Sequence, residues 1–323
     1  MGGVLVVRPS SLGDVVWALA IARDVAAARP GLAVDWLAEE AFVALPAMCA
    51  DVRRTIPVAI RRWRRSPLSG ATWRAIGEMR AALRAERYDA ILDLQEQVKG
   101  GVLARVAAGP RHGFDRSSIR EPVATLFHQM HHAVPRDLHF ATRCRRLAGA
   151  ALDYAVEGPP RWRWTLPPLP AFAPARPYVV AVHATSRDDK RWPEAHWRAL
   201  LADVDASGFD VVLPHGSDSE ERAGRALAAG LERARVPPRA PLDAMAALLA
   251  GAHAVVGVDT GLTHLAAALG TPTLALFTVT DARLAGTSIA GSHARDLGGR
   301  GESPTVEDAR AALGGMLRRA PGC

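Results

Sequence analysis

The sequence of 323 residues lacks the features that would place it in a membrane or outside the cell. All of its apolar runs are broken well short of the roughly 20 residues that a membrane-spanning helix needs. No charged segment and cleavage site precede the first apolar run, Val4–Val7, so we expect no export signal. The three cysteines, an odd number and far apart, form neither a disulfide framework nor a metal-binding pattern. We therefore expect a cytoplasmic protein.

The turn after Val4–Val7 also lacks both of the common phosphate-binding motifs. It reads Arg8-Pro-Ser-Ser-Leu-Gly-Asp14, without the Gly-x-Gly-x-x-Gly of dinucleotide-binding turns and without the Gly-Lys-Ser/Thr of a P-loop. Instead it places a carboxylate, that of Asp14, where a helix begins. Asp14 is predicted either to cap this helix or to act as a general base in a cleft.

A metal-ligand pattern is missing as well. His128, His131 and His132 are close together, but no carboxylate or cysteine has ligand spacing to them, which favours surface positions. Asp203 and Asp205 form an Asp-x-Asp pair, but at the end of a predicted helix, where we expect them to be solvated. The sequence predicts neither a metal site nor a cofactor.

What the chain does contain is a repeated alternation of apolar strands and amphipathic helices. Such alternation predicts parallel sheets with helices on both faces. The predicted strands are residues 4–7, 33–37, 89–94, 178–183, 209–213, 254–258 and 273–277. The predicted helices are residues 14–28, 73–86, 194–206, 219–231, 242–250, 262–269 and 305–319.

Seven prolines between Gly158 and Pro177 interrupt this alternation. Because proline fits neither a helix interior nor a central strand, the segment is predicted to be an extended linker that packs its aromatic side chains. The sequence thus predicts two domains, residues 1–158 and 178–323, with a linker over 159–177. We expect a cleft between them.

The excess of positive over negative charge is confined to the first half of the chain. Residues 1–155 contain 22 Lys+Arg against 15 Asp+Glu, whereas residues 156–323 contain 18 of each. This polarity indicates that the first half meets something acidic, such as nucleic acid, anionic lipid or a phosphorylated sugar. A generally arginine-rich proteome is the alternative.

Two loops of the second half have the residues of a phosphate site. Asp259-Thr260-Gly261 follows the strand 254–258 and opens a helix that carries His264, so that backbone N–H groups are available to an anion. Thr185, Ser186 and Lys190 follow the strand 178–183, and Lys190 could neutralise charge on a departing diphosphate. The alternatives are helix capping by Asp259 and an ordinary polar loop.

Three weaker candidates complete the set. Glu220 follows the strand 209–213 and could bind ribose hydroxyls, or belong to a capping box. The tract Arg61-Arg62-Trp-Arg64-Arg65 could grip carboxylates or phosphates, and Arg120 is a further anion ligand. Gln95 follows the strand 89–94 and is predicted to point to the same cleft.

In this order along nearly the whole chain, these motifs resemble those of the ADP-heptose:lipopolysaccharide heptosyltransferases, and most of all the type I enzymes. The resemblance rests on Ser10-Ser-Leu-Gly-Asp14, Ile60–Arg64, Tyr88–Gln95, Arg120-Glu-Pro, His183–Trp197 and Val258–Leu265. It implies a GT-B architecture, in which two Rossmann-like domains with parallel sheets face each other across a cleft. The first domain would receive the acceptor, and the second would hold the nucleotide sugar.

The resemblance also implies a reaction. L-glycero-D-manno-heptose would pass from ADP-heptose to the Kdo of Kdo2-lipid A, with inversion and without a divalent metal. Asp14 would be the base, assisted by Lys190; the donor would be held by Thr185, Ser186, Lys190, Glu220, Asp259, Thr260, Gly261 and His264. The acceptor would be held by Ser10, Ser11, Gly13, Arg61, Arg62, Arg64, Gln95 and Arg120. The enzyme would work peripherally on the inner face of the inner membrane, without nucleic acid.

One departure from the family pattern affects the acceptor path. Glu96 stands after Asp93-Leu-Gln95, where the family usually has glycine, and we expect it to add a negative charge there. The alternatives are a type II or III heptosyltransferase, which extends a heptosylated core, and a non-catalytic nucleotide-sugar-binding protein. A nucleic-acid binder is more remote, because no nucleic-acid-binding module surrounds the arginine tract.

Overall fold

The computed structural model describes residues 2–318. The chain forms two compact units, Met1–Thr165 and Leu166–Cys323, and the division falls inside the predicted linker. Arg319, at the predicted end of the last helix, and Cys323 lie outside the described residues; Cys49 and Cys144 are buried free thiols. None of the described helices is both long enough and apolar enough to cross a bilayer.

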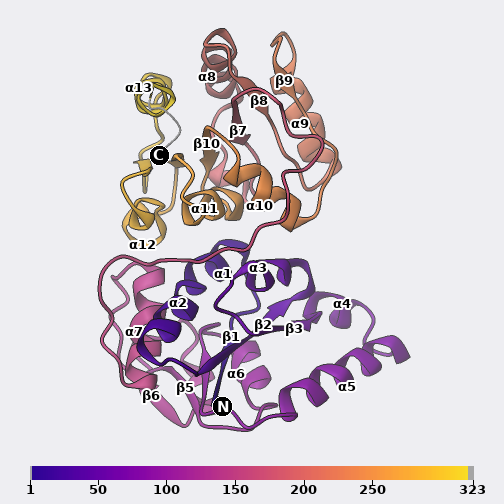
Figure 1. The fold of residues 1–323 in the computed structure, drawn as a ribbon, viewed down its shortest axis with the longest axis vertical. Helices are drawn as coiled ribbons and strands as arrows, with labels where there is room; N and C mark the ends of the chain where they lie inside the picture. Colours follow the sequence, from indigo (N-terminus) through magenta and orange to yellow (C-terminus); the bar gives the residue numbers. More distant parts are fainter. Residues whose placement is uncertain (1, 319–323) are drawn as a thin grey trace. The chain divides into compact units, whose positions relative to one another are not determined.

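Unit 1 is built on a sheet of six parallel strands in the order β3-β2-β1-β4-β5-β6 (Figure 1). The central strands β1 and β4 are completely buried, and apart from Asp93 at the end of β4 they are apolar, as is typical of parallel strands covered on both faces. The strands are β1 (Gly3–Val7), β2 (Ala33–Glu39), β3 (Arg54–Val58), β4 (Ala90–Asp93), β5 (Arg111–Phe114) and β6 (Met130–His132).

Helices cover both faces of this sheet. Side chains of α5 and α6 form a core with one face, around Leu5, Ile91 and Leu103, whereas α1, α2 and α7 pack together. The helices are α1 (Leu12–Ala18), α2 (Ala20–Ala28), α3 (Ala44–Met48), α4 (Ile60–Arg65), α5 (Gly70–Arg84), α6 (Val98–Ala104) and α7 (Phe140–Leu152), with 3-10 turns η1 (Glu40–Phe42) and η2 (Pro122–Phe127). The predicted helix 14–28 begins earlier, at Leu12, and is interrupted at Leu19.

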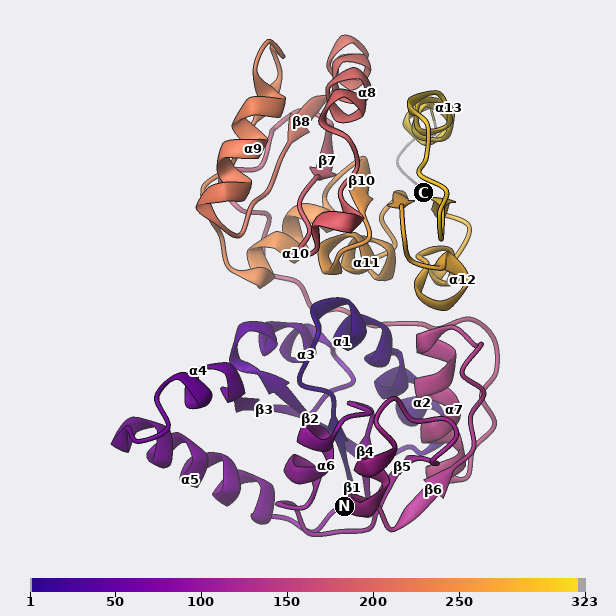
Figure 2. The ribbon, with the colours of Figure 1, turned by 180° about the vertical axis from the view of Figure 1, so that it is seen from behind.

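Unit 2 repeats the same strand order, β12-β11-β10-β7-β8-β9, again all parallel. Figure 2 labels β7, β8 and β10 of this sheet. Its strands are β7 (Tyr178–Val182), β8 (Asp210–Val212), β9 (Ala234–Arg235), β10 (Ala254–Val258), β11 (Thr273–Phe277) and β12 (Ala294–Gly298). Its helices are α8 (Glu194–Ala206), α9 (Asp218–Ala228), α10 (Leu242–Ala250), α11 (Gly261–Ala268), α12 (Ala282–Ala285) and α13 (Val306–Leu317), with η3 (Asp188–Lys190) and η4 (Ser288–Ala290). The predicted α/β class with two parallel sheets is confirmed.

The proline-rich segment is extended, and its first part packs on unit 1. The indole of Trp162 donates to the carbonyl of Val16 at 2.9 Å and lies against Trp17. The backbone of Trp164 forms an isolated antiparallel β-bridge with that of Cys49. This bridge and the Trp162 contacts fix the end of unit 1.

Each unit has one position where the strand order reverses, and these positions locate the candidate sites. In unit 1 it lies between β1 and β4, and in unit 2 between β7 and β10. Ligands of open parallel sheets bind beyond the carboxyl ends of the strands at such a position. Asp14 and Gln95 follow the first pair of strands, and Thr185 and Asp259 follow the second.

Candidate functional site

Asp14 is held at the start of α1 by donors that all bind one of its carboxylate oxygens. Oδ2 accepts hydrogen bonds from the backbone N–H and hydroxyl of Ser11, at 3.0 and 2.7 Å, and pairs with Arg8 at 2.6 Å. Burial alone raises the pKa of Asp14, but the charge of Arg8 and the Ser11 hydrogen bonds outweigh it and hold the pKa below its ordinary value. The carboxylate is therefore ionised at neutral pH, and its side chain is 37% exposed.

A polar cavity of about 480 Å³ opens beside Asp14 at the carboxyl edge of the unit 1 sheet. Four of the predicted acceptor residues line it with Asp14: Ser10, Ser11, Gln95 and Arg120. The amide of Gln95 links the two loops, because its Oε1 accepts from the Ser10 N–H at 3.3 Å. The structure thus brings together the loops after β1 and β4.

The other predicted acceptor residues do not line this cavity. Gly13 is buried within the first turn of α1. Arg61, Arg62 and Arg64 are exposed on α4, and Arg62 pairs with Glu40 at 3.0 Å. Of the four arginines in the predicted acceptor set, only Arg120 therefore reaches the cavity.

Sequence reasoning missed most of the cations that do line the cavity. They are Arg8, Lys99, Arg136 and Arg143, with Phe140 beside them. Arg143 lies on α7, a helix that the sequence analysis did not predict, and Lys99 lies at the start of α6, also unpredicted. With Arg120, five cations and the two carboxylates of Asp14 and Glu96 line the cavity, which therefore suits an anionic ligand.

Glu96 does not act as the unpaired negative charge that we expected. Its two carboxylate oxygens accept from the guanidinium of Arg143, each at 3.0 Å, and both side chains are buried. Arg143 also lies over the ring of Phe114, 4.6 Å from its centroid. Glu96 has φ 59°, a left-handed conformation that glycine adopts most easily and that agrees with the glycine of the family pattern.

The prediction that His128 lies on the surface is wrong. His128 is buried, and its Nε2 lies 2.9 Å from Oδ2 of Asp93, at the end of β4. The carboxylate partner is 35 positions away in the sequence, so local spacing could not reveal it. Across residues 2–318, no group of three or more His, Cys, Asp or Glu side chains is placed to hold a metal ion.

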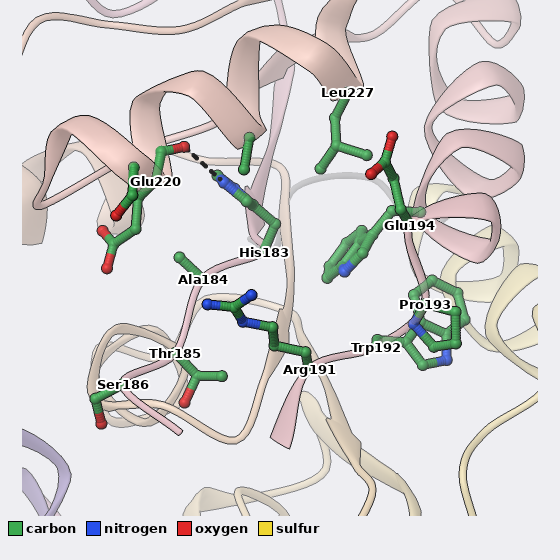
Figure 3. Close-up of a pocket in the computed structure, with 13 residues that line it drawn as sticks. His183, Ala184, Thr185, Ser186, Arg191, Trp192, Pro193, Glu194, Glu220 and Leu227 are labelled. Carbon is green, nitrogen blue, oxygen red and sulfur yellow. Dashed lines mark hydrogen bonds between the residues drawn. The ribbon is translucent and has the colours of Figure 1, made fainter. Parts of the chain in front are cut away.

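A second cavity, of about 620 Å³, lies in unit 2 next to the loop after β7 (Figure 3). Thr185, Ser186 and Glu220 line it, as the sequence analysis expected of donor-binding residues. Oε2 of Glu220 accepts from the Gly216 N–H at 2.6 Å, whereas the neighbouring Glu221 turns to Arg225 on the surface of α9. Glu220, rather than Glu221, is therefore the carboxylate of this loop that lines the cavity. Glu194 lines it as well and is paired with Arg198 at 2.7 Å.

The rest of the cavity comes from residues that the sequence analysis did not select. Arg191 extends across it below His183 and Ala184, as Figure 3 shows. Trp192, Trp197 and Leu227 supply an apolar wall. A polar edge of hydroxyls and a guanidinium beside an apolar wall suits a ligand that joins phosphate to an organic ring.

Lys190, Asp259 and His264 form a connected group that does not line the cavity. The Lys190 ammonium lies 2.6 Å from Oδ2 of Asp259, and His264 Nε2 lies 3.1 Å from Oδ1. Burial alone raises the pKa of Asp259, but hydrogen bonds and charge from His264 and Lys190 lower it strongly. Asp259 therefore stays ionised and fixes the position of Lys190.

The loop of Asp259 leads directly into a helix. Thr260 is the N-cap residue of α11, which begins at Gly261. Thr263 donates its hydroxyl to the Val258 carbonyl at 2.8 Å, and this bond ties the helix start to the end of β10. Asp259 itself binds side chains, so the alternative that it merely caps the helix is not what the structure shows.

Comparisons with known proteins agree with this architecture. The family model "Glycosyltransferase family 9 (heptosyltransferase)" matches residues 76–308. The chain is 45% identical over 280 residues to lipopolysaccharide heptosyltransferase 1 of Pseudomonas aeruginosa, covering 85% of this chain and 78% of that one. It is 41% identical over 293 residues to the enzyme of the same name from Escherichia coli K12, covering 88% and 90%.

Solved structures of the E. coli heptosyltransferase WaaC are similar along the whole chain. The complex with ADP superposes with a TM-score of 0.87 at 37% identity, covering 97% of this chain and 99% of that one. The complex with ADP-2-deoxy-2-fluoro heptose gives a TM-score of 0.82 at 36% identity, with the same coverage. The chain described here belongs to glycosyltransferase family 9, the heptosyltransferases.

Proposed function

We propose that this protein is an inverting lipopolysaccharide heptosyltransferase of type I, which transfers L-glycero-D-manno-heptose from ADP-heptose to the Kdo of Kdo2-lipid A. Identities of 41% and 45% to two enzymes named heptosyltransferase 1 support the type. The observation that carries the chemistry is an ionised Asp14 in a cavity whose lining has five cations against two carboxylates. Kdo is an acid, so this cavity suits the acceptor.

Unit 1 supplies the acceptor step. Oδ2 of Asp14 accepts from Ser11 and Arg8, whereas Oδ1 has no partner among the described residues. Oδ1 is therefore the atom that takes the proton from the acceptor hydroxyl as its oxygen attacks the anomeric carbon. The bond from that carbon to the diphosphate oxygen breaks, and ADP leaves with the electron pair.

Unit 2 supplies the donor step. The diphosphate is bound by the hydroxyls of Thr185 and Ser186 and by the N–H groups at the start of α11. The ribose is bound by Glu220. Asp259 holds Lys190, so that its ammonium is already oriented when charge builds on the leaving group. The remaining donor-binding residues are Thr260, Gly261 and His264. The proposal assigns this charge neutralisation to Lys190 and requires no divalent ion.

Product analysis tests the proposal. Purified protein and ADP-heptose are incubated with Kdo2-lipid A or with an acceptor that already carries the first heptose, with and without EDTA. We expect transfer to Kdo2-lipid A in both conditions. Transfer only to the heptosylated acceptor would assign the chain to type II or III, and ADP-heptose binding without transfer to either would make it a non-catalytic binding protein.

The site of action follows from the acceptor. Lipid A is embedded in a bilayer and ADP-heptose is water-soluble, so we propose a cytoplasmic enzyme that works peripherally on the inner face of the inner membrane. We propose no nucleic-acid partner.

A further inference from the structure

A group of exposed apolar side chains lies next to the cationic cavity of unit 1. Val102 on α6 is 50% exposed, and Val123 and Leu126 on η2 are 61% and 79% exposed. We call these three residues the apolar patch. Neighbouring exposed apolar side chains of this kind mark interaction surfaces far more often than single exposed leucines do.

Packing between α6 and η2 holds the patch together. The two elements touch at Gly101, where an added Cβ would lie 2.6 Å from the Cβ of Phe127. Val102 and Leu126 each adjoin one of these contacting residues. His131 Nε2 lies 3.1 Å from the Thr125 carbonyl oxygen, a contact that ties η2 to β6.

Cations without ion-pair partners surround the patch. Lys99 and Arg105 lie three positions before and after Val102 on α6, and Arg120 lies three positions before Val123. None of the three forms an ion pair with a described residue, and Lys99 and Arg120 also line the acceptor cavity. The nearby carboxylate of Glu121 is engaged by the Val98 N–H and the Gln97 amide, at 2.9 and 3.0 Å.

We propose that the apolar patch is the surface by which unit 1 docks on an anionic phospholipid bilayer. Apolar side chains enter the boundary between headgroups and acyl chains, and the surrounding lysine and arginines meet anionic headgroups. The inference rests on the proposed function, because a lipid-embedded acceptor requires its cavity to open beside the bilayer. The patch shares α6 and the Arg120–Val123 segment with that cavity.

Flotation with vesicles tests the proposal. The full chain is mixed with vesicles of phosphatidylethanolamine and phosphatidylglycerol that contain no saccharide acceptor, at low and high salt. We expect binding that weakens with salt. In Val123→Ser/Leu126→Ser, binding falls by at least about tenfold, as expected when two side chains of this size no longer enter the bilayer.

Matched variants show whether the loss of binding is specific to the patch. Leu284→Ser removes an exposed leucine of unit 2 and leaves binding unchanged. Leu68→Ser/Trp73→Ser removes another exposed apolar pair of unit 1, Leu68 between α4 and α5 and Trp73 on α5, and we expect it to cost less binding than the patch variant. Thermal unfolding should show a Tm close to that of the wild type for each variant, since all of these side chains are exposed.

Three results would overturn the proposal. They are unchanged binding of the patch variant, loss of binding in the Leu68/Trp73 variant alone, and wild-type binding only to vesicles that contain the lipid acceptor. Transfer to a water-soluble, deacylated Kdo acceptor separates this inference from the proposed function. Unchanged transfer by the patch variant supports docking, whereas no transfer by the wild type refutes the function and leaves the vesicle result standing.

Discussion

Arg8 and Asp14 form an ion pair in which a guanidinium nitrogen lies 2.6 Å from Oδ2, the carboxylate oxygen that also accepts both hydrogen bonds from Ser11. Arg8 also donates to the Leu94 carbonyl and lies over the Phe140 ring, so it is fixed by three neighbours. A fixed cation on Oδ2 orients the carboxylate and keeps it ionised, while Oδ1 remains available. The pair joins the first βα turn to the end of β4 and to α7.

Asp14→Asn is expected to lower the rate of heptose transfer by at least about a hundredfold, because an amide cannot accept the acceptor proton. The affinity for ADP, measured by calorimetry, should not change, since the donor residues lie in unit 2. Wild-type turnover in a folded variant would show that Asp14 is not the base.

Arg8→Met should shift the acid limb of the pH–rate profile to higher pH. The base acts when ionised, so activity falls as pH drops through its pKa, and Arg8 holds the pKa of Asp14 low. Without Arg8, burial raises this pKa and the fall begins at higher pH. Arg8→Lys, which keeps the charge, should shift the limb less; identical limbs in all three proteins would contradict the assigned role.

Lys190→Gln should lower kcat for ADP-heptose by roughly a hundredfold, the cost of losing one preorganised charge at a leaving group. KM should change much less, because Lys190 is assigned to the charge that develops in the transition state. Lys190→Arg, measured beside it, should recover part of kcat. A rise in KM with kcat unchanged would instead make Lys190 a ground-state binding residue.

Glu96→Gly tests a balance between backbone strain and a buried ion pair. Glycine at position 96 removes about 1 kcal/mol of backbone strain, because position 96 has a left-handed conformation. It also leaves the buried Arg143 unpaired, which costs about 3–5 kcal/mol of folding stability. Urea unfolding should therefore show a net destabilisation. Adding Arg143→Met should recover part of it; a stabilised single variant would show that the pair contributes nothing.

His112 should make stability depend on pH. Burial, followed by the neighbouring His132, lowers the pKa of His112 from 6.5 to about 4, so the unfolded chain takes up a proton that the folded chain does not. The contribution of the neutral His112 to the free energy of unfolding is fully present above about pH 6.5 and is lost as pH falls toward 4. The Tm of His112→Asn should vary less over this range, and that of His131→Asn, at an exposed histidine, should follow the wild type.

Several elements could be predicted because their patterns are local. The strands 254–258 and 273–277 and the helices 194–206 and 242–250 begin and end as predicted, since apolar runs and flanking breakers set both ends. Helix α7 was missed because its inward side includes Arg143 and Arg145, which are buried only through distant partners, Glu96 and Asp24. Burial of charge depends on contacts that no local pattern contains.

Local patterns were enough to establish the two parallel sheets, the order of the motifs and the uneven distribution of charge. Periodicity, turn residues and composition depend only on residues that are near each other in the sequence. They also identified Asp14, Thr185, Ser186 and Glu220 as residues that line cavities. Three-dimensional packing was needed to show which cations surround Asp14, that Asp259 holds Lys190, and that Glu96 is neutralised by Arg143. The last two pairings span 69 and 47 positions, and long-range packing alone brings such side chains into contact.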